Sequence, residues 1–277
     1  MSVDALPPEG AADESADLRR QIGVLHAELA QARQAVEDLN YAISHDLRAP
    51  LRHVRAYLQI VEEDFGTSLA PALRKHLQTV DEAAAQASRM VDALLELSRL
   101  RQYSLRPLPV DLPQLVRQVL GEATATDDAT ARAAPLQWTL QGDAPRLHCD
   151  PELLQQVLRR LFSNAAKFTR RQATARVDVS WTTVPGKQAG AVGLAPGDCC
   201  EIRIRDNGAG FDPRQADGLC RPFQRLHAVR DFEGLGVGLA YVALALQRMR
   251  GDIQIHSEGP QMGCEVVLRL PLSPPLH

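Results

Sequence analysis

The chain has 277 residues with 45% hydrophobic and 4% aromatic content, which is enough for two modest domains rich in aliphatic side chains. Its 31 basic and 34 acidic residues give a net charge of −3, so no basic surplus indicates binding to nucleic acid or to an anionic membrane. The five cysteines form no CxxC pair, which argues against a disulfide framework or a zinc ribbon. No uncharged apolar run approaches the roughly 18 residues of a membrane helix. We therefore expect a cytoplasmic protein without membrane insertion.

The N-terminal part begins with a segment, residues 1–16, whose Pro, Gly, Ala and acidic residues predict a disordered leader. Apolar residues then alternate in steps of four and three, which predicts a coiled-coil seam made of Leu18, Ile22, Leu25, Leu29, Ala32, Val36, Leu39 and Ile43. The spacing resumes one residue out of step at Leu47, Leu51, Val54, Leu58, Val61 and Phe65. His45 lies outside the seam in either register, so we expect its imidazole to face solvent.

Residues 65–72 contain Gly and Pro and predict a turn. The seam spacing then continues through Leu73, Leu77, Val80, Ala84, Ala87, Val91 and Leu94. This pattern predicts a helical hairpin, and one hairpin can bury its seam on one side only. Two copies related by a two-fold axis would form a four-helix bundle, so we expect a homodimer.

The second half of the chain follows the Pro-containing stretch 106–113, so we place the domain boundary near residue 105. Helices are predicted from about Leu112, after Asp150 and near Gly236, and strands over 136–140, 175–181 and 200–205, with a final hairpin from Gly251. Such a mixture predicts one mixed sheet covered by helices, which is an α/β sandwich. The expected organisation is therefore α+β, with a leader (1–16), a dimerising helical domain (17–105), a second domain (106–272) and a tail (273–277).

One candidate for chemistry is the segment SHDLRAPL, which places His45 beside Asp46 on a helix. A neutral imidazole is a good nucleophile near pH 7, and a neighbouring carboxylate can orient it and accept its proton. An exposed histidine beside a solvated acid is also a common surface feature, so this pair by itself is weak evidence.

A second candidate is the segment RDNGAGFD, in which Asp206 ends an alternating strand and is followed by Gly208 and Gly210. Asp206 could accept a hydrogen bond from the amino group of a base, and the glycines allow close approach of a ligand. The plain alternative is a β-turn. Gly234, Gly236 and Gly238 then precede a helix, an arrangement that can hold phosphate at the helix N-terminus.

The segment 153–169 places Asn164 and Lys167 three residues apart, hence on one helix face. An amide oxygen for Mg²⁺ and an ammonium group for phosphate would suit a nucleotide. The combination of these segments is stronger evidence than any one of them.

The motifs SHDLRAP, SNAAKFT, DNGAGF, RPFQRLH and EGLGVGL stand in the order and spacing of the boxes of two-component sensor histidine kinases. The chain resembles this family from about Tyr41 to Leu270, and it is most similar to the group that includes phytochrome-type output modules. The resemblance implies a dimerisation and phosphoacceptor domain followed by an ATP-binding domain of the Bergerat (GHKL) type.

The resemblance also implies roles for individual residues. His45 would accept the phosphoryl group with Asp46 as base, Asn164 would bind Mg²⁺, Lys167 would touch phosphate, and Asp206 would recognise adenine. The pocket would be shaped by Gly208, Gly210, Gly234, Gly236, Gly238 and Leu239. Residues 211–233 would form a mobile lid over ATP, in which Phe223 packs as an anchor and Arg225 neutralises phosphate charge; ordinary core packing is the alternative for Phe223.

Three positions depart from the family pattern. Arg160 stands one turn before Asn164, where many relatives carry asparagine or a carboxylate, and it could weaken metal binding or compensate phosphate charge. Ala49 stands four residues after the histidine, which predicts weak phosphatase activity. Leu235 replaces the usual threonine and removes a hydroxyl group near the phosphates.

The implied reaction is transfer of the ATP γ-phosphoryl group to His45, then to an aspartate in the receiver domain of a response regulator. The signal would enter through the first helix, the leader or a separate upstream sensor. One alternative is a chaperone-type or mismatch-repair ATPase, which usually needs a carboxylate where this chain has Arg160. Another is a degenerate kinase that serves as a dimeric nucleotide-binding scaffold, for which Arg160 and Leu235 are the evidence.

Overall fold

The structure is a computed structural model that describes residues 9–126, 134–143, 146–185, 198–226 and 231–272. It divides into two compact units, Met1–Ser98 and Arg99–His277. Within the described residues, no helix combines the length and the apolar content needed to cross a membrane.

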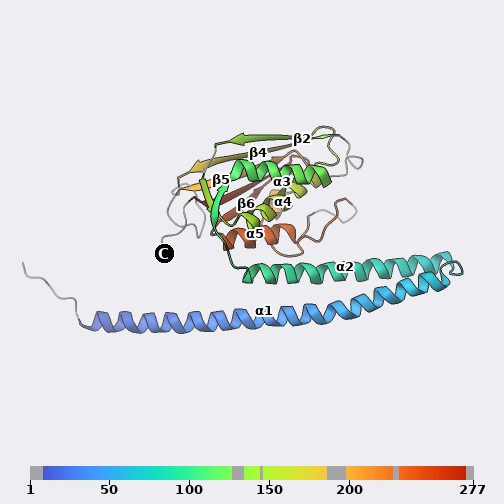
Figure 1. Cartoon of the computed structure of the whole chain (residues 1–277), viewed down its shortest axis with the longest axis horizontal. Helices are drawn as coiled ribbons and strands as arrows, with labels where there is room; N and C mark the ends of the chain where they lie inside the picture. Colours follow the sequence, from blue (N-terminus) through green and yellow to red (C-terminus); the bar gives the residue numbers. More distant parts are fainter. Residues whose placement is uncertain (1–8, 127–133, 144–145, 186–197, 227–230, 273–277) are drawn as a thin grey trace, which may run out of the picture. The chain divides into compact units, whose positions relative to one another are not determined.

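The first unit is a helical hairpin. Helix α1 spans Glu9–Phe65 and helix α2 spans Pro71–Gln102, with the turn between them at the predicted place (Figure 1). Exposed ion pairs join the two helices: Arg48 Nη2 lies 2.7 Å from Asp92 Oδ1, and Arg55 Nε lies 3.0 Å from Asp81 Oδ1. Because Asp92 lies opposite the earlier arginine and Asp81 opposite the later one, the helices are antiparallel.

The beginning of α1 corrects one expectation. Residues 9–16 belong to the helix and not to a disordered leader, whereas residues 1–8 lie outside the described part of the chain. The segment carries Ala11, Ala12 and Glu14, and alanine and glutamate have high helix propensity. The helix that carries the seam from Leu18 therefore begins at Glu9.

Many seam residues of the first unit are exposed in the single chain. The exposed seam residues include Ile22, Leu25, Leu29, Val36, Ile43, Leu47, Val54, Leu73 and Val80. Exposed apolar side chains repeated at seam spacing along a helix are typical of an interface with another helix.

The second unit contains a five-stranded sheet with the order β2-β4-β5-β7-β6. Its strands are β2 (Leu136–Gly142), β4 (Ala175–Val184), β5 (Cys199–Asp206), β6 (Asp252–His256) and β7 (Cys264–Pro271). Strands β2 and β4 are parallel, and the other neighbours are antiparallel. A separate antiparallel pair joins β1 (Leu108–Asp111) to β3 (Arg146–Cys149).

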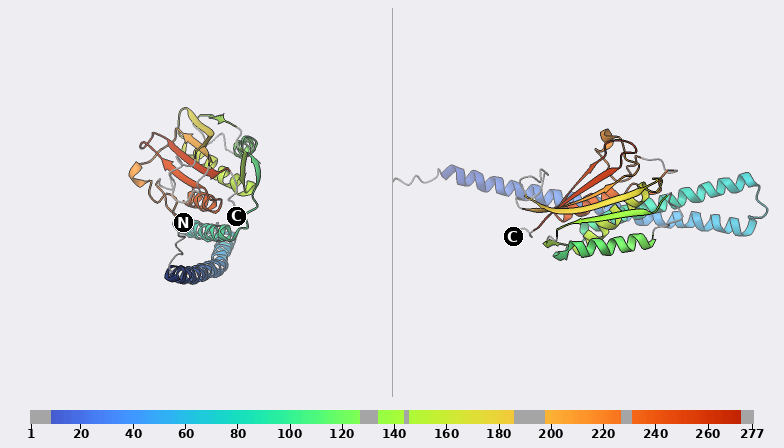
Figure 2. Two further views of the ribbon diagram at one scale, coloured as in Figure 1. Left: turned by 90° about the vertical axis from the view of Figure 1, so that its left-hand side faces the viewer. Right: turned by 90° about the horizontal axis from the view of Figure 1, so that it is seen from above.

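Three helices cover one side of the five-stranded sheet: α3 (Leu112–Thr126), α4 (Pro151–Phe168) and α5 (Gly238–Arg248) (Figures 1 and 2). Alternate residues of β4, among them Val177 and Val179, are buried, as period-two alternation predicts for a strand with one covered face. Trp138 of β2 contacts Phe162 of α4 edge to face, with ring centroids 5.2 Å apart. The predicted α/β sandwich is confirmed, although the sequence patterns did not indicate β1 and β3.

The division between the units falls inside α2 and not near residue 105. Arg248, at the end of α5, donates hydrogen bonds to the carbonyl oxygens of Arg101 and Tyr103. The backbone N–H of Arg106 donates to Asp150 Oδ2 at 2.8 Å. These bonds fix the last turn of α2 and the Pro-containing stretch to the second unit.

Candidate active site

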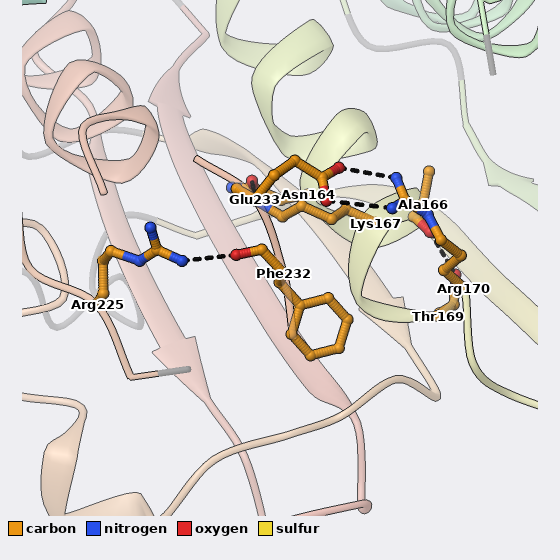
Figure 3. A network of polar contacts seen from close by, with 8 residues as sticks. All are labelled: Asn164, Ala166, Lys167, Thr169, Arg170, Arg225, Phe232 and Glu233. Carbon is orange, nitrogen blue, oxygen red and sulfur yellow. Dashed lines mark hydrogen bonds and ion pairs between the residues drawn. The ribbon is translucent and has the colours of Figure 1, made fainter. Parts of the chain in front are cut away.

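Helix α4 presents Asn164 and Lys167 near its C-terminal end. The helix starts firmly, because the side chain of Asp150 accepts a hydrogen bond from the N–H of Leu153 at 2.9 Å and Pro151 occupies the first turn. Its apolar face is buried. Lys167 Nζ donates to Asn164 Oδ1 at 3.3 Å, as expected for two residues three apart on a helix, and to the carbonyl oxygen of Glu233 at 3.2 Å (Figure 3).

The environment of Lys167 suits an anion. Burial lowers the pKa of its ammonium group, an effect that the Glu233 carboxylate opposes and that Arg225 and Arg170 reinforce. Two of the three ammonium N–H donors are used by the hydrogen bonds just described, and Nζ also lies 4.5 Å from the centroid of the Phe168 ring. Three cations around one carboxylate leave an excess of positive charge that a polyanion would neutralise.

Asp206 is the buried carboxyl group of the site. It is 7% exposed at the end of β5, and its Oδ1 accepts a hydrogen bond from the N–H of Gly208 at 2.8 Å. Burial raises its pKa to about 6, although the backbone N–H groups of Gly208 and Cys264 lower it in part. A carboxyl group that is buried away from water in this way is well suited to accept a hydrogen bond from a ligand amino group.

The two glycines after Asp206 are required by close contacts. A Cβ atom on Gly208 would lie 2.7 Å from the carbonyl oxygen of Phe168. Gly210 has a φ of +55°, and a Cβ atom there would lie 2.2 Å from the carbonyl oxygen of Gly259. The N–H of Ala209 also donates to the carbonyl oxygen of Phe168 at 3.1 Å. The loop after β5 is therefore held against the end of α4.

The glycine-rich loop leads directly into α5. Gly234 and Gly236 have φ angles of +127° and +75°, which favour glycine. Gly238 is the first residue of α5, and a Cβ atom there would lie 3.8 Å from Asn164 Nδ2. Val237, the N-cap residue, makes no side-chain hydrogen bond to the helix. The first N–H groups of α5 thus lack a side-chain cap and lie beside Asn164, an arrangement that suits an anion. Leu239 follows and is half-buried.

The predicted lid, residues 211–233, is described except for residues 227–230. Among its described residues, Pro213–Gln215 forms a short 3-10 helix. Phe223 is half-buried and has a φ of +65°. Arg225 donates to the carbonyl oxygen of Phe232 at 2.6 Å and to that of Gly234. In this structure Arg225 therefore holds the segment before the glycine-rich loop.

The predicted phosphoacceptor and base lie in the first unit, whereas the other predicted site residues lie in the second. His45 belongs to α1, but its side chain is outside the described part of the structure, so the expected exposure of its imidazole stays a prediction. The side chain of Asp46 is exposed.

Two models of protein families match the chain. Residues 35–102 match the His Kinase A (phospho-acceptor) domain. Residues 149–274 match the family described as histidine kinase-, DNA gyrase B-, and HSP90-like ATPase. The first match lies almost entirely in the first unit and the second lies in the second unit, in the order that two-component kinases have. The chain belongs to the two-component sensor histidine kinases.

Curated histidine kinases are similar to the chain over most of its length. The methanogenesis regulatory histidine kinase FilI of Methanothrix harundinacea is 26% identical over 92% of the chain, which corresponds to 26% of FilI. Cyanobacterial phytochrome B of Nostoc is 25% identical over 86% of the chain and 30% of that protein. The adaptive-response sensory kinase SasA of Synechococcus elongatus is 28% identical over 91% of the chain and 63% of SasA. The chain thus spans less than a third of FilI and of phytochrome B.

Solved structures show the same fold. Full-length ShkA in complex with AMPPNP has a TM-score of 0.57 and 22% identity, and the match covers 84% of this chain and 45% of ShkA. The Acinetobacter baumannii histidine kinase AdeS has a TM-score of 0.52 and 21% identity, with 83% of this chain and 98% of AdeS covered.

The structure shows what surrounds Arg160, one of the three positions that depart from the family pattern. The guanidinium carbon of Arg160 lies 3.9 Å from the centroid of the Tyr241 ring on α5. The hydroxyl group of Tyr241 donates to Gln156 Oε1, one turn earlier on α4, at 2.5 Å. Arg160 therefore joins α4 to α5 by a cation–π contact. Ala49 and Leu235 are both half-buried, and nothing in the structure shows a consequence of either residue.

Sequence reasoning missed residues of the β6–β7 turn that brace the loop after β5. Ser257 Oγ accepts from the N–H of Phe211 at 3.0 Å and donates to the carbonyl oxygen of Gly263 at 2.7 Å. Gly263 has a φ of +77°, and a Cβ atom there would lie 2.0 Å from the carbonyl oxygen of Asp206. The only sequence signal was the pair Gly259 and Gly263 in the predicted hairpin.

A second missed group lies at the end of α4. The buried Thr169 hydroxyl donates to the carbonyl oxygen of Ala165 at 2.8 Å, and Arg170 forms a bidentate ion pair with Glu233. Thr169 is the last residue of the motif SNAAKFT, Arg170 follows it directly, and Glu233 is the first residue of the motif EGLGVGL, so the motifs pointed to these positions without assigning them a role.

Proposed function

We propose that this chain binds ATP in the second unit and transfers its γ-phosphoryl group to His45. The observation that carries the proposal is the meeting of Lys167 and Asn164 with the glycine-rich start of α5, at a cationic site with an uncapped helix N-terminus. Family membership supports the same reaction.

The adenine end of the site would be Asp206. Its carboxyl group would accept a hydrogen bond from the exocyclic amino group of adenine, while Gly208 and Gly210 permit the close backbone contacts that hold the loop beside it. The phosphate end would be Lys167 and the first N–H groups of α5.

The residues present fit Mg²⁺ held together with a triphosphate. Among the described residues, no group of three or more His, Cys, Asp or Glu side chains could hold a metal by itself. Mg²⁺ in nucleotide sites commonly takes one or two protein oxygens and completes its shell with phosphates and water. Asn164 Oδ1 would supply one such oxygen, and the ion would neutralise charge on the phosphates.

In the reaction, a ring nitrogen of neutral His45 attacks the γ-phosphorus in line with the leaving oxygen. A P–N bond forms, the P–O bond to ADP breaks, and Asp46 accepts a hydrogen bond from the other ring nitrogen or takes up its proton. Because His45 and Lys167 belong to different units, this step requires His45 to meet the γ-phosphate held by the second unit. The phosphoryl group would then pass to an aspartate of a response-regulator receiver domain. All five cysteines are free thiols, which suits the cytoplasm.

Incubation of the full chain with Mg²⁺ and γ-labelled ATP tests the reaction. We expect label that is stable to base and labile to acid, as a phosphoramidate is, and we expect its loss in His45→Gln and Asp206→Asn. The His45→Gln variant should still bind ADP, which separates loss of the acceptor from loss of the pocket. Nucleotide binding by the wild type without any label would contradict the kinase reaction and favour a scaffold role.

The first unit would act as a homodimer, because the exposed seam of α1 and α2 needs a partner of the same spacing. Leu25 and Leu29 are 62% and 46% exposed in the single chain. Light scattering on the full chain should give the mass of two copies, and Leu25→Asp/Leu29→Asp should increase the monomer fraction. A wild-type monomer at micromolar concentration would contradict the dimer.

A further inference from the structure

The segment Asp231–Gly234, which ends at the first glycine of the glycine-rich loop, is fastened to the C-terminal end of α4 (Figure 3). Arg170 donates to both carboxylate oxygens of Glu233, with Nη2 at 2.8 Å from Oε1 and Nη1 at 3.1 Å from Oε2. Two parallel N–H···O bonds of this kind fix direction as well as distance. The Glu233 side chain is therefore oriented and not merely near a positive charge.

The backbone of the same segment is held as well. The carbonyl oxygen of Glu233 accepts from Lys167 at 3.2 Å, and that of Phe232 accepts from Arg225 at 2.6 Å. Figure 3 shows the Arg170 and Arg225 side chains approaching the segment from opposite sides. Carboxylate and carbonyl groups of consecutive residues thus face three different cations.

An adjacent contact adds apolar packing. The ring of Phe232 is buried and meets the ring of Phe168 edge to face, with centroids 5.0 Å apart. Arg171 lies over the Phe232 ring at 5.3 Å and pairs with Asp231 at 3.1 Å. Phe168 is the last residue of α4, so the segment is packed on the helix that presents Lys167.

The contacts between the segment Asp231–Gly234 and α4 matter because the glycine-rich loop has little intrinsic order. Gly234 and Gly236 adopt positive φ angles, and glycine loses more conformational freedom on ordering than any other residue. A loop that is free before binding must be ordered at the expense of ligand affinity, whereas a loop fastened in advance avoids most of that cost.

We propose that Arg170 and Glu233 are positioning residues for the nucleotide: their ion pair fastens the segment Asp231–Gly234 to α4, so that the glycine-rich loop meets the phosphates already ordered. The inference rests on the proposed nucleotide site. It assigns Arg170 no contact with phosphate, because Nη1 and Nη2 both donate to Glu233 and Arg170 acts through that residue.

This role predicts an effect on affinity and not on the chemical step. Arg170→Gln and Glu233→Gln should each raise the Kd for Mg²⁺-ADP about fivefold, which corresponds to about 1 kcal/mol. The double variant should be no weaker than either single variant, because both remove the same interaction. At saturating ATP the autophosphorylation rate should stay within about twofold of the wild type. Arg170→Lys should recover part of the affinity, since lysine keeps the charge without the two-pronged geometry.

Calorimetric titration of the full chain with Mg²⁺-ADP measures these constants. The matched control is Arg159→Gln, which breaks a pair of the same kind between α4 and α3, with Nη2 2.6 Å from Glu122 Oε2; its Kd should equal that of the wild type. The side chain of Glu233 is 63% exposed, so Glu233→Gln should fold even if the Arg170 variants do not.

Three results would overturn the inference. One is an unchanged Kd in Glu233→Gln, and another is additive losses in the double variant. The third is a reduced autophosphorylation rate at saturating ATP with an unchanged Kd, which would indicate that Arg170 acts on the reacting phosphate. A wild type that binds no Mg²⁺-ADP would instead refute the proposed nucleotide site itself.

Discussion

Replacement of Asp206 by asparagine should make the empty second unit more stable while it abolishes adenine nucleotide binding. The pKa of this carboxyl group lies at about 6 in the folded protein, compared with an ordinary value of 3.8. Keeping it ionised in the folded state therefore costs about 3 kcal/mol at neutral pH. Asparagine removes this cost but accepts weaker hydrogen bonds from the N–H groups of Gly208 and Cys264, which lowers the stability by about 1 kcal/mol. The net gain should be about 1–2 kcal/mol.

The stability gained in the Asp206→Asn variant should depend on pH, because it comes from the ionisation of Asp206 in the wild type. Below pH 3.8 the carboxyl group is protonated in the folded and unfolded chains alike, so it imposes no ionisation cost. Between pH 3.8 and about 6 the unfolded chain has released the proton and the folded chain retains it, so the wild type loses stability relative to the variant as pH rises. Above about pH 6 the difference stays constant.

Thermal unfolding of both proteins at pH 4 and pH 7 without nucleotide tests this reasoning. At pH 7 the variant should melt higher by about 2–4 °C for each kcal/mol gained, and at pH 4 the advantage should vanish. Added Mg²⁺-ADP should raise the melting temperature of the wild type only. A variant less stable than the wild type at pH 7, or a difference that is the same at both pH values, would refute the account of Asp206.

Two further predictions concern the β6–β7 turn beside Asp206 and the ion pairs of β5. Gly263→Ala should destabilise the second unit by about 3 kcal/mol or more, seen as a lower melting temperature, because the new Cβ would lie 2.0 Å from the carbonyl oxygen of Asp206 at a φ of +77°; a change below about 1 kcal/mol would contradict the close contact. Burial tends to raise the pKa of Glu201, but hydrogen bonds from Arg269 and Arg203 outweigh this effect, so the pKa is lowered. The ion pairs of Glu201 should therefore stabilise the folded state above its ordinary pKa of 4.5, and this stabilisation should be lost as the pH falls. Urea unfolding between pH 6 and pH 3 should therefore show a smaller loss for Glu201→Gln than for the wild type, and equal losses would contradict the assignment.

Local patterns predicted the local structure of the site. A helix was predicted after Asp150, where α4 lies, and the three-residue spacing of Asn164 and Lys167 predicted neighbours on one face; the structure has a hydrogen bond between them. The glycines before α5 predicted an irregular loop that opens a helix, as found. These features depend on residues within a few positions of one another, which is what a single sequence reveals.

Contacts between distant segments could not be predicted in the same way. Strands β1 and β3 have four residues each, too few to show alternation, and they form because they pair with each other. Arg170 and Glu233 are 63 residues apart, and Gly263 reaches Asp206 only because β7 pairs with β5 in one register. Such contacts follow from tertiary packing. The seam of α1, by contrast, was visible in the sequence because its period continues over many turns.

Of the eight histidines of the chain, His45 is the one expected to accept the phosphoryl group. The most direct measurement is mass-spectrometric mapping of the phosphorylated chain, digested at neutral to basic pH after incubation with Mg²⁺-ATP. The account predicts phosphate on the peptide that contains His45, and an unmodified chain in the His45→Gln variant under the same conditions. Phosphate on another histidine, or undiminished phosphorylation of the variant, would contradict it.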